Sequence, residues 1–127
     1  MQDRDNIAQE LASVFKILAH RDRILIVETL RFREVGVTQL AEALNLGATR
    51  VSQHLALMRA HRMVEERRDG RRVLYSLAQP DLAHWITDGL QFVEARAAAD
   101  RINGRVVNSV RREWGVGDDE CEGVEKQ

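Results

Sequence analysis

Four neighbouring polar side chains stand out because of what they could bind together. They are Thr49, Arg50, Ser52 and Gln53. Arginine pairs with the O6 and N7 edge of guanine, glutamine pairs with the N6 and N7 edge of adenine, and serine or threonine pairs with either base. On a helix these side chains lie away from an apolar stripe made by Val51, Leu55 and Met58. The pattern predicts a helix that buries one face and presents the other to base edges in a DNA major groove.

A second basic group surrounds the tip of a predicted hairpin. Asp69-Gly70 favours a type I′ turn, in which both central residues have positive φ. The surrounding arginines are Arg67, Arg68, Arg71 and Arg72. We expect them to lie along a DNA backbone or to reach into a minor groove. The alternative is a charged hairpin that only keeps the surface soluble, with Glu65, Glu66 and Asp69 as partners, and the clustering of four arginines favours DNA contact.

The basic character of the chain is local. The 127 residues carry a formal net charge of -1, yet residues 49–72 hold seven arginines against three acidic residues. A basic patch on a nearly neutral protein is typical of phosphate contact. Two roles remain open for His54, at the flank of the same helix: donation to a phosphate, or packing against the protein.

The elements that must position these groups follow from the spacing of apolar residues. Helices are predicted over residues 5–19, 21–32, 38–44, 48–60, 81–102 and 105–114. Residues 33–36 are expected to form a connection, and Thr38 is expected to cap the helix after it. Asn45–Gly47 is expected to be the turn between two helices, because asparagine and glycine tolerate left-handed backbone angles.

Strands are predicted over residues 64–68 and 72–77, on either side of the Asp69-Gly70 turn. From Gly115 the sequence is rich in glycine and acidic residues, which predicts a disordered tail. The fold class is therefore mainly α with a small β-hairpin wing, in the order of a winged helix-turn-helix.

The composition excludes several classes of protein. No stretch reaches the roughly 20 apolar residues that a membrane span needs, and the polar, acidic N-terminus is not a signal peptide. A single cysteine, Cys121, allows no disulfide within one chain and no multi-cysteine metal site. We expect a cytoplasmic protein without a cofactor. An enzyme is not expected, since no nucleophile–base pair, phosphate-binding glycine loop or metal cluster is recognisable.

The segments LAHRDRILIVETL and VTQLAEALNLGATRVSQHLALMRAHRMVEERRDGRRVLYSL resemble the ArsR/SmtB-type transcriptional repressors. The resemblance covers about residues 11–93, and its specific marks are Ser52-x-His54-Leu55, the stretch 57–64 and the Asp69-Gly70 wing. It implies a homodimer that binds double-stranded DNA at an inverted-repeat operator and represses nearby genes. A two-fold dimer places its recognition helices about one turn of DNA apart, so a roughly palindromic operator is expected.

The resemblance also implies where the two subunits meet. In the family the first helix and the helix after the wing form the dimer interface, here residues 5–19 and 81–102. The apolar residues expected there are Leu11, Phe15, Leu18, Trp85 and Leu90. We expect a DNA-binding and dimerisation domain over residues 1–104, and a C-terminal helical extension with an acidic tail over residues 105–127.

The usual metal-sensing residues of the family are missing. The stretch 37–41, where many relatives carry thiols, has none, and the positions used on the helix after the wing hold Gln79, Asp81, Phe92 and Ala95. A displaced site is conceivable at Asp81, His84 and Asp88, which share one helical face. We prefer to see these three as solvent-facing polar residues. Cys121 in an acidic segment is a poor thiolate.

Two functions from different classes therefore compete. The first is a homodimeric, sequence-specific repressor whose effector is not a metal at the usual family sites, and whose signal is an unidentified small molecule or none at all. A metal-responsive repressor using the displaced Asp/His site is its variant. The second is a winged-helix protein-interaction module that does not read DNA. The positive patch and the polar helix face favour the first.

Overall fold

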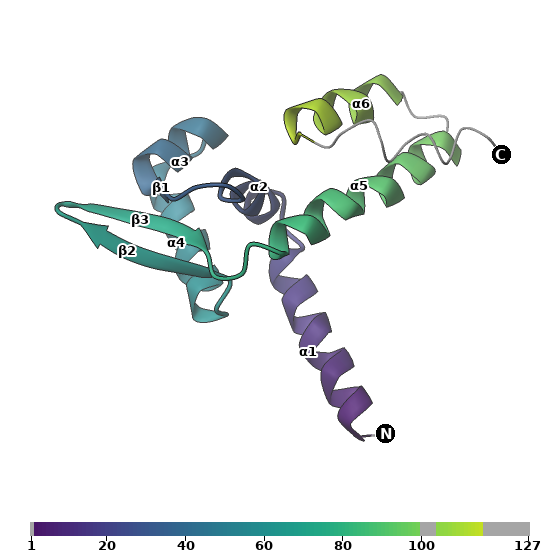
Figure 1. Cartoon of the computed structure of the whole chain (residues 1–127), viewed down its shortest axis with the longest axis horizontal. Coiled ribbons are helices and arrows are strands. Elements are labelled where there is room, and N and C mark those ends of the chain that lie inside the picture. The colour runs from purple at the N-terminus through teal and green to yellow at the C-terminus, as the bar shows by residue number, and fades with distance from the viewer. Residues whose placement is uncertain (1, 100–103, 116–127) are drawn as a thin grey trace. The chain divides into compact units, whose positions relative to one another are not determined.

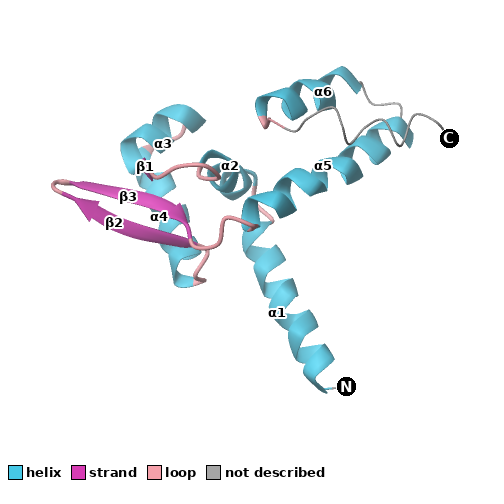
Figure 2. Cartoon of the chain, in the orientation of Figure 1, coloured by secondary structure: helices cyan, strands magenta, loops and turns pink. Residues whose placement is uncertain are grey.

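A computed structural model gives the fold and describes residues 2–99 and 104–115. The chain divides into two compact units, residues 1–83 and 84–127. Figure 1 follows the elements along the chain. Their bounds are α1 (Gln2–Leu18), α2 (Arg21–Thr29), β1 (Val35–Gly36), α3 (Val37–Leu44), α4 (Ala48–Ala60), β2 (Val64–Asp69), β3 (Arg72–Leu77), α5 (Leu82–Ala99) and α6 (Gly104–Glu113). Helices dominate, with one small sheet (Figure 2), as the sequence predicts.

The first two helices have complementary charges or caps at their ends. In α1, Asp3 and Asp5 lie in the first turn and Lys16 in the last, which suits the helix dipole. In α2 the ring nitrogen Nδ1 of His20 accepts the backbone N–H of Asp22 at 3.1 Å and caps the helix. α2 ends at Thr29, earlier than the predicted residue 32, because the N–H of Leu30 and Arg31 closes the last turn before the chain extends into β1.

The predicted connection over residues 33–36 contains a strand. Val35 and Gly36 pair antiparallel with Tyr75 and Leu74, so that the sheet has the order β1-β3-β2. The hairpin is thus part of a three-stranded sheet.

The predicted cap at Thr38 is wrong. α3 begins one residue earlier, with Gly36 in the cap position, and the Gln39 side chain accepts the Gly36 backbone N–H at 3.4 Å. The extended backbone of Gly36 both ends β1 and starts α3, which leaves Thr38 inside the helix.

The helix-turn-helix has the predicted layout. α3 ends at Leu44 and is capped by Asn45, whose φ of 54° is left-handed and lets the chain reverse toward α4. α4 has the predicted bounds, and Val51, Leu55 and Met58 are fully buried. After α4, Arg62 takes a φ of 60°, although it is not glycine, and the N–H of Met63 returns to the carbonyl of Met58. This tight reversal leads directly into β2.

The hairpin turn differs from the prediction. Asp69 pairs with Arg72, so β2 is one residue longer than expected and the loop is Gly70-Arg71. Gly70 has a φ of 64°, whereas Arg71 is not among the described residues with positive φ. Positive φ at the first central residue alone is the pattern of a type II′ turn, which also matches the twist of the flanking strands. The type I′ prediction was wrong because it assumed a shorter β2.

The core of the first unit lies between the helices and the sheet base. β2 lies against α4, and α3 contacts both β1 and β3. The largest fully buried side chains include Ile26, Val27 and Leu40 together with the α4 stripe and Val64. Because these residues come from α2, α3, α4 and β2, the core fixes the hairpin relative to the second helix of the helix-turn-helix.

The second unit contains most of α5, followed by α6, and Arg111 of α6 forms an ion pair with Glu94 of α5. None of the described helices has the length and hydrophobicity needed to cross a membrane. The predicted disordered tail and Cys121 lie outside the described residues, apart from Gly115.

Candidate nucleic-acid interface

The polar face of α4 is exposed, as the helical spacing predicts. Thr49, Arg50, Ser52 and Gln53 are all solvent-exposed, while the stripe of Val51, Leu55 and Met58 faces the core. All four polar residues lie in the first half of α4, the part of a recognition helix that usually contacts bases. The second helix of the helix-turn-helix therefore presents hydrogen-bonding groups on a surface held from behind by core packing.

Arg50 is held in place by a buried acid. Its Nε lies 2.9 Å from Oδ2 of Asp22, whose side chain is only 2% exposed, whereas the side chain of Arg50 is 59% exposed. Within the described residues, the terminal nitrogens of Arg50 have no hydrogen-bond or ion-pair partner. The guanidinium is thus anchored on one side and available on the other.

The second role open to His54, packing against the protein, is the one its geometry favours. Its Nε2 lies 3.1 Å from Oδ2 of Asp22, and its side chain is mostly buried. Because a carboxylate only accepts hydrogen bonds, Nε2 carries the proton and donates it. His20 completes the group, since its ring centroid lies 4.6 Å from that of His54.

The environment of Asp22 keeps it charged. Burial by itself raises the pKa of Asp22, but the hydrogen bond to His54 and the charge of Arg50 outweigh burial and lower the pKa below its ordinary value. Arg21 adds a further contact, at 3.4 Å from Oδ1. Asp22 is therefore a buried carboxylate that links the start of α2 to the exposed face of α4.

The wing arginines differ in their partners. Arg67 donates from Nε and Nη2 to the carboxylate of Glu34, both at 2.9 Å, and Arg72 lies 3.6 Å from Asp69. Within the described chain, Arg68 and Arg71 form no ion pair. The hydrogen bond with Glu34 lowers the pKa of Glu34 and raises that of Arg67, so both stay charged. The four arginines are thus not equally available.

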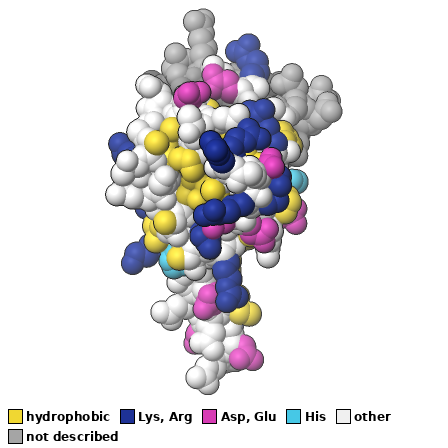
Figure 3. Space-filling view, turned by 90° about the vertical axis from the view of Figure 1, so that its left-hand side faces the viewer, with side chains coloured by type: hydrophobic (Ala, Val, Ile, Leu, Met, Phe, Trp, Pro, Cys, Tyr) yellow, Lys and Arg dark blue, Asp and Glu magenta, His cyan; other side chains and the backbone are white. Residues whose placement is uncertain are grey.

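The strand register divides these arginines further. Arg67 is paired with Leu74 and Arg68 with Val73, so neighbouring arginines of β2 point to opposite faces of the hairpin. Figure 3 looks onto the side where the hairpin tip lies and shows Lys and Arg side chains across it, with acidic side chains between them. The tip carries Arg71 beside Gly70, so Arg68 and Arg71 are the wing arginines that have no acidic partner within the described chain.

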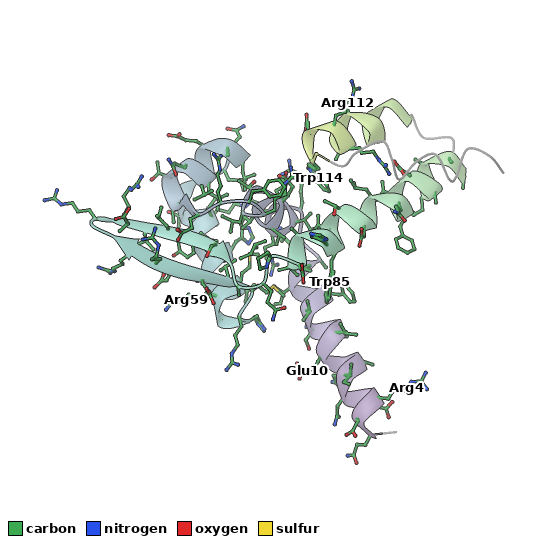
Figure 4. The ribbon with its side chains drawn as sticks, viewed as in Figure 1. Arg4, Glu10, Arg59, Trp85, Arg112 and Trp114 are labelled. Atoms are coloured by element: carbon green, nitrogen blue, oxygen red, sulfur yellow. The ribbon has the colours of Figure 1, made fainter. Side chains whose placement is uncertain are left out.

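A further acid–base pair joins α4 to the wing. Arg59, labelled in Figure 4, reaches from α4 to Glu66 of β2 at 2.8 Å. Tyr75 of β3 donates to the same carboxylate group at 3.3 Å. Burial raises the pKa of Tyr75, and the neighbouring Glu66 adds to this effect, so the phenol stays neutral.

Sequence reasoning missed Asp22, His20 and Glu34. Glu34 precedes a two-residue strand that has no periodic signal, and Asp22 looks like an ordinary acid in the first turn of a helix. Their partners lie about 30 residues away along the chain. Only the folded arrangement shows that the two carboxylates, Asp22 and Glu34, neutralise part of the positive charge of residues 49–72.

The predicted dimer residues divide into two groups. Leu11, Phe15 and Trp85 are exposed, whereas Leu18 and Leu90 are buried within the chain. Other large apolar side chains are exposed on the same helices: Ile7 on α1 and Phe92 and Val93 on α5. Asp81 precedes α5, and Asp81, His84 and Asp88 do not form a group with closely spaced donor atoms. The group that the described residues do form is His20, Asp22 and His54.

These features define a winged helix-turn-helix, and comparison with known proteins supplies the family. The model of the bacterial regulatory protein arsR family matches residues 20–66. The chain is 38% identical over 92 residues to the transcriptional regulator Rv0081 of Mycobacterium tuberculosis, covering 72% of this chain and 80% of that protein. This chain belongs to the ArsR family of DNA-binding transcriptional regulators, and such regulators are not enzymes.

Two further comparisons extend the likeness. The chain is 36% identical over 80 residues to the regulator KmtR of M. tuberculosis, covering 63% of this chain and 62% of that protein. The crystal structure of Rv0081 superposes with a TM-score of 0.64 at 36% identity, covering 76% of this chain and 97% of that one. The homodimeric winged helix-turn-helix domain of Mb0332 from Mycobacterium bovis superposes with a TM-score of 0.63 at 28% identity, covering 80% and 92%.

Proposed function

We propose that this protein is a homodimeric, sequence-specific repressor that acts on an inverted-repeat operator. The observation that carries the proposal is the placement of Arg50, which is exposed on α4 but anchored through Nε to the buried carboxylate of Asp22. An arginine fixed in this way loses less freedom when its terminal nitrogens bind guanine, so it suits base reading better than a mobile surface arginine.

The proposed roles of the individual side chains follow from their exposure and from their ion-pair partners. Thr49, Arg50, Ser52 and Gln53 read base edges, while Arg68 and Arg71 of the wing contact phosphates or the minor groove. Arg67 and Arg72 serve mainly the hairpin, since each already has an acidic partner. His54 acts from behind the reading face through Asp22.

The homodimer is supported by the exposed apolar side chains of α1 and α5 and by the homodimeric relative Mb0332. A dimer with two-fold symmetry presents two copies of α4, which is why the operator should be an inverted repeat. A protein that must reach chromosomal DNA is expected in the cytoplasm. The effector is not a metal bound by thiols of α3, since residues 37–41 contain no cysteine.

The test is selection of bound duplexes from a random pool in EDTA, followed by fluorescence anisotropy on the selected sequence and on a scrambled one. An inverted repeat should emerge. Gln53→Ala should weaken binding to the selected duplex but leave binding to the scrambled duplex unchanged. Arg4→Ala, which removes an exposed arginine on α1, is the control and should change neither.

The same experiment can overturn the proposal. If selection returns no common sequence, the protein does not read DNA through α4, and an interaction module becomes the better description. If Arg68→Ala leaves the salt dependence of binding unchanged, the wing makes no phosphate contact, because each lost contact should lower the slope by about one.

A further inference from the structure

Three potential metal ligands meet behind the reading face of α4. They are His20 and Asp22 at the start of α2 and His54 on α4, and one donor atom from each lies within 4.8 Å of the other two. Asp22 is buried and His54 is mostly buried, so the group is held by packing and is not a chance meeting of mobile surface side chains. Two imidazoles and one carboxylate are the donor set that Zn²⁺, Co²⁺ and Ni²⁺ favour in proteins.

We propose that His20, Asp22 and His54 form a site for a divalent transition-metal ion of the Zn²⁺ class, and that the ion competes with Arg50 for Asp22. The site differs from the displaced Asp81/His84/Asp88 site suggested by the sequence, and it uses no cysteine. Three protein ligands leave at least one position for water, which distinguishes the site from a closed structural zinc site with four protein ligands.

Binding requires that the present hydrogen bonds be given up. When Nε2 of His54 binds the metal, the proton that it donates to Asp22 at 3.1 Å is given up and Nδ1 takes a proton from solvent, so the ring stays neutral as the other tautomer. His20 Nδ1 now accepts the N–H of Asp22, so ligation through this nitrogen gives up the cap of α2, whereas ligation through Nε2 keeps it. Because the ligands must be unprotonated, the site binds metal at neutral pH better than in acid.

The two arginines on Asp22 are the competitors of the metal. Arg21 lies 3.4 Å from Oδ1 and Arg50 lies 2.9 Å from Oδ2. Both side chains are largely exposed, so each can turn into water at little cost when a cation takes the carboxylate. The two histidines are less exposed than these arginines and cannot leave so easily, which favours their acting as ligands.

This competition couples the site to DNA. The oxygen that Arg50 grips is the one that His54 also contacts, so a cation there repels the guanidinium and removes its anchor. Metal is therefore expected to weaken reading by α4 while leaving the contacts of the wing intact. The coupling rests on the proposed function, but the metal site does not.

The first experiment uses the full chain, freed of metal, without DNA. Zn²⁺ is titrated by calorimetry and Co²⁺ by its visible absorption, and about one equivalent per chain is expected. His54→Gln retains a donor to Asp22 but not the imidazole, and His20→Asn retains a helix cap but not the imidazole. Each should weaken metal binding at least about tenfold. His84→Ala and His61→Ala, which remove imidazoles outside the cluster, should bind like the parent.

The outcomes are distinct. Binding that survives both His54→Gln and His20→Asn places the metal elsewhere and overturns the proposal, as does a parent protein that binds neither ion. Circular dichroism of each variant confirms that it is folded before its result is used. If binding is lost in only one variant, the other histidine is not a ligand, and the three-ligand site is wrong.

The second experiment measures binding to the selected duplex in EDTA and with one equivalent of Zn²⁺. Metal should weaken binding by the parent but not by His54→Gln. Duplex binding in EDTA tests the proposed function, and zinc binding without DNA tests the site, so either can fail alone. Metal binding without an effect on DNA would overturn the competition with Arg50 and leave the site standing.

Discussion

At the scale of single residues, the pair of Asp22 and Arg50 joins the interior to the surface that we propose meets DNA. The carboxylate holds Nε at 2.9 Å, so the outward part of the guanidinium keeps a fixed direction. Lysine has a single charged nitrogen. It cannot pair with Asp22 and at the same time bind a base edge bidentately. The identity of residue 50 therefore matters beyond its charge.

Arg50→Lys should separate specific from general DNA binding. Loss of one bidentate base contact removes about 1–3 kcal/mol of discrimination, or roughly 5- to 150-fold in affinity for the selected duplex. Binding to a scrambled duplex should change little, because the charge is kept. Competition anisotropy with both duplexes measures the two quantities. An equal loss on both would mean that Arg50 contacts only phosphate.

At the scale of elements, α4 depends on its buried stripe. Leu55 is fully buried, so Leu55→Ala should lower the free energy of unfolding by about 2–5 kcal/mol. Leu57 lies on the same helix but is 38% exposed, and Leu57→Ala should cost less. Chemical denaturation of both variants provides the comparison. Similar losses would show that α4 packs through a different face.

The hairpin turn gives a second prediction at this scale. Gly70 has a φ of 64°, and a Cβ there would meet no atom within 4 Å, so the cost of Gly70→Ala is backbone strain alone. That cost is about 1–2 kcal/mol, and Gly70→Asn should cost less because asparagine tolerates left-handed angles better. The midpoint of thermal unfolding should be highest for the parent, lower for Gly70→Asn and lowest for Gly70→Ala. A lower midpoint for Gly70→Asn than for Gly70→Ala would contradict this explanation.

The elements also show what a sequence can reveal. The bounds of α4 and its stripe follow from local spacing, and the left-handed turn at Asn45 follows from residue type. β1 is too short to carry a pattern, and the pairs of Glu34 with Arg67 and Asp22 with His54 join residues more than 30 positions apart. Such contacts depend on the tertiary fold, so the sequence predicted the exposed polar face of α4 but not the carboxylate that anchors Arg50.

At the scale of the whole molecule, α1 carries large apolar side chains that are exposed in the single chain. Ile7, Leu11 and Phe15 recur every four residues and are exposed. Phe15→Asp should disrupt a dimer that uses this face, shifting the mass measured by light scattering toward the monomer and weakening binding to a full inverted repeat more than to a half-site.

Phe32→Asp is the matched control for that change. Phe32 is 84% exposed, lies outside α1 and α5, and contacts Arg31 through its ring. Its replacement should leave the dimer intact. If both variants remain dimeric, the subunits meet through another surface; if both become monomeric, the effect is not specific to α1.

The left-handed backbone at Arg62 connects the stability of the fold with the strength of DNA binding. A long cationic side chain occupies a conformation that glycine adopts without strain, so Arg62→Gly should raise the free energy of unfolding by up to about 1 kcal/mol. The same change removes one of the seven arginines of residues 49–72. If Arg62→Gly is more stable to unfolding but binds DNA more weakly at high salt, the left-handed backbone at residue 62 costs stability while its side chain adds a positive charge that favours DNA binding.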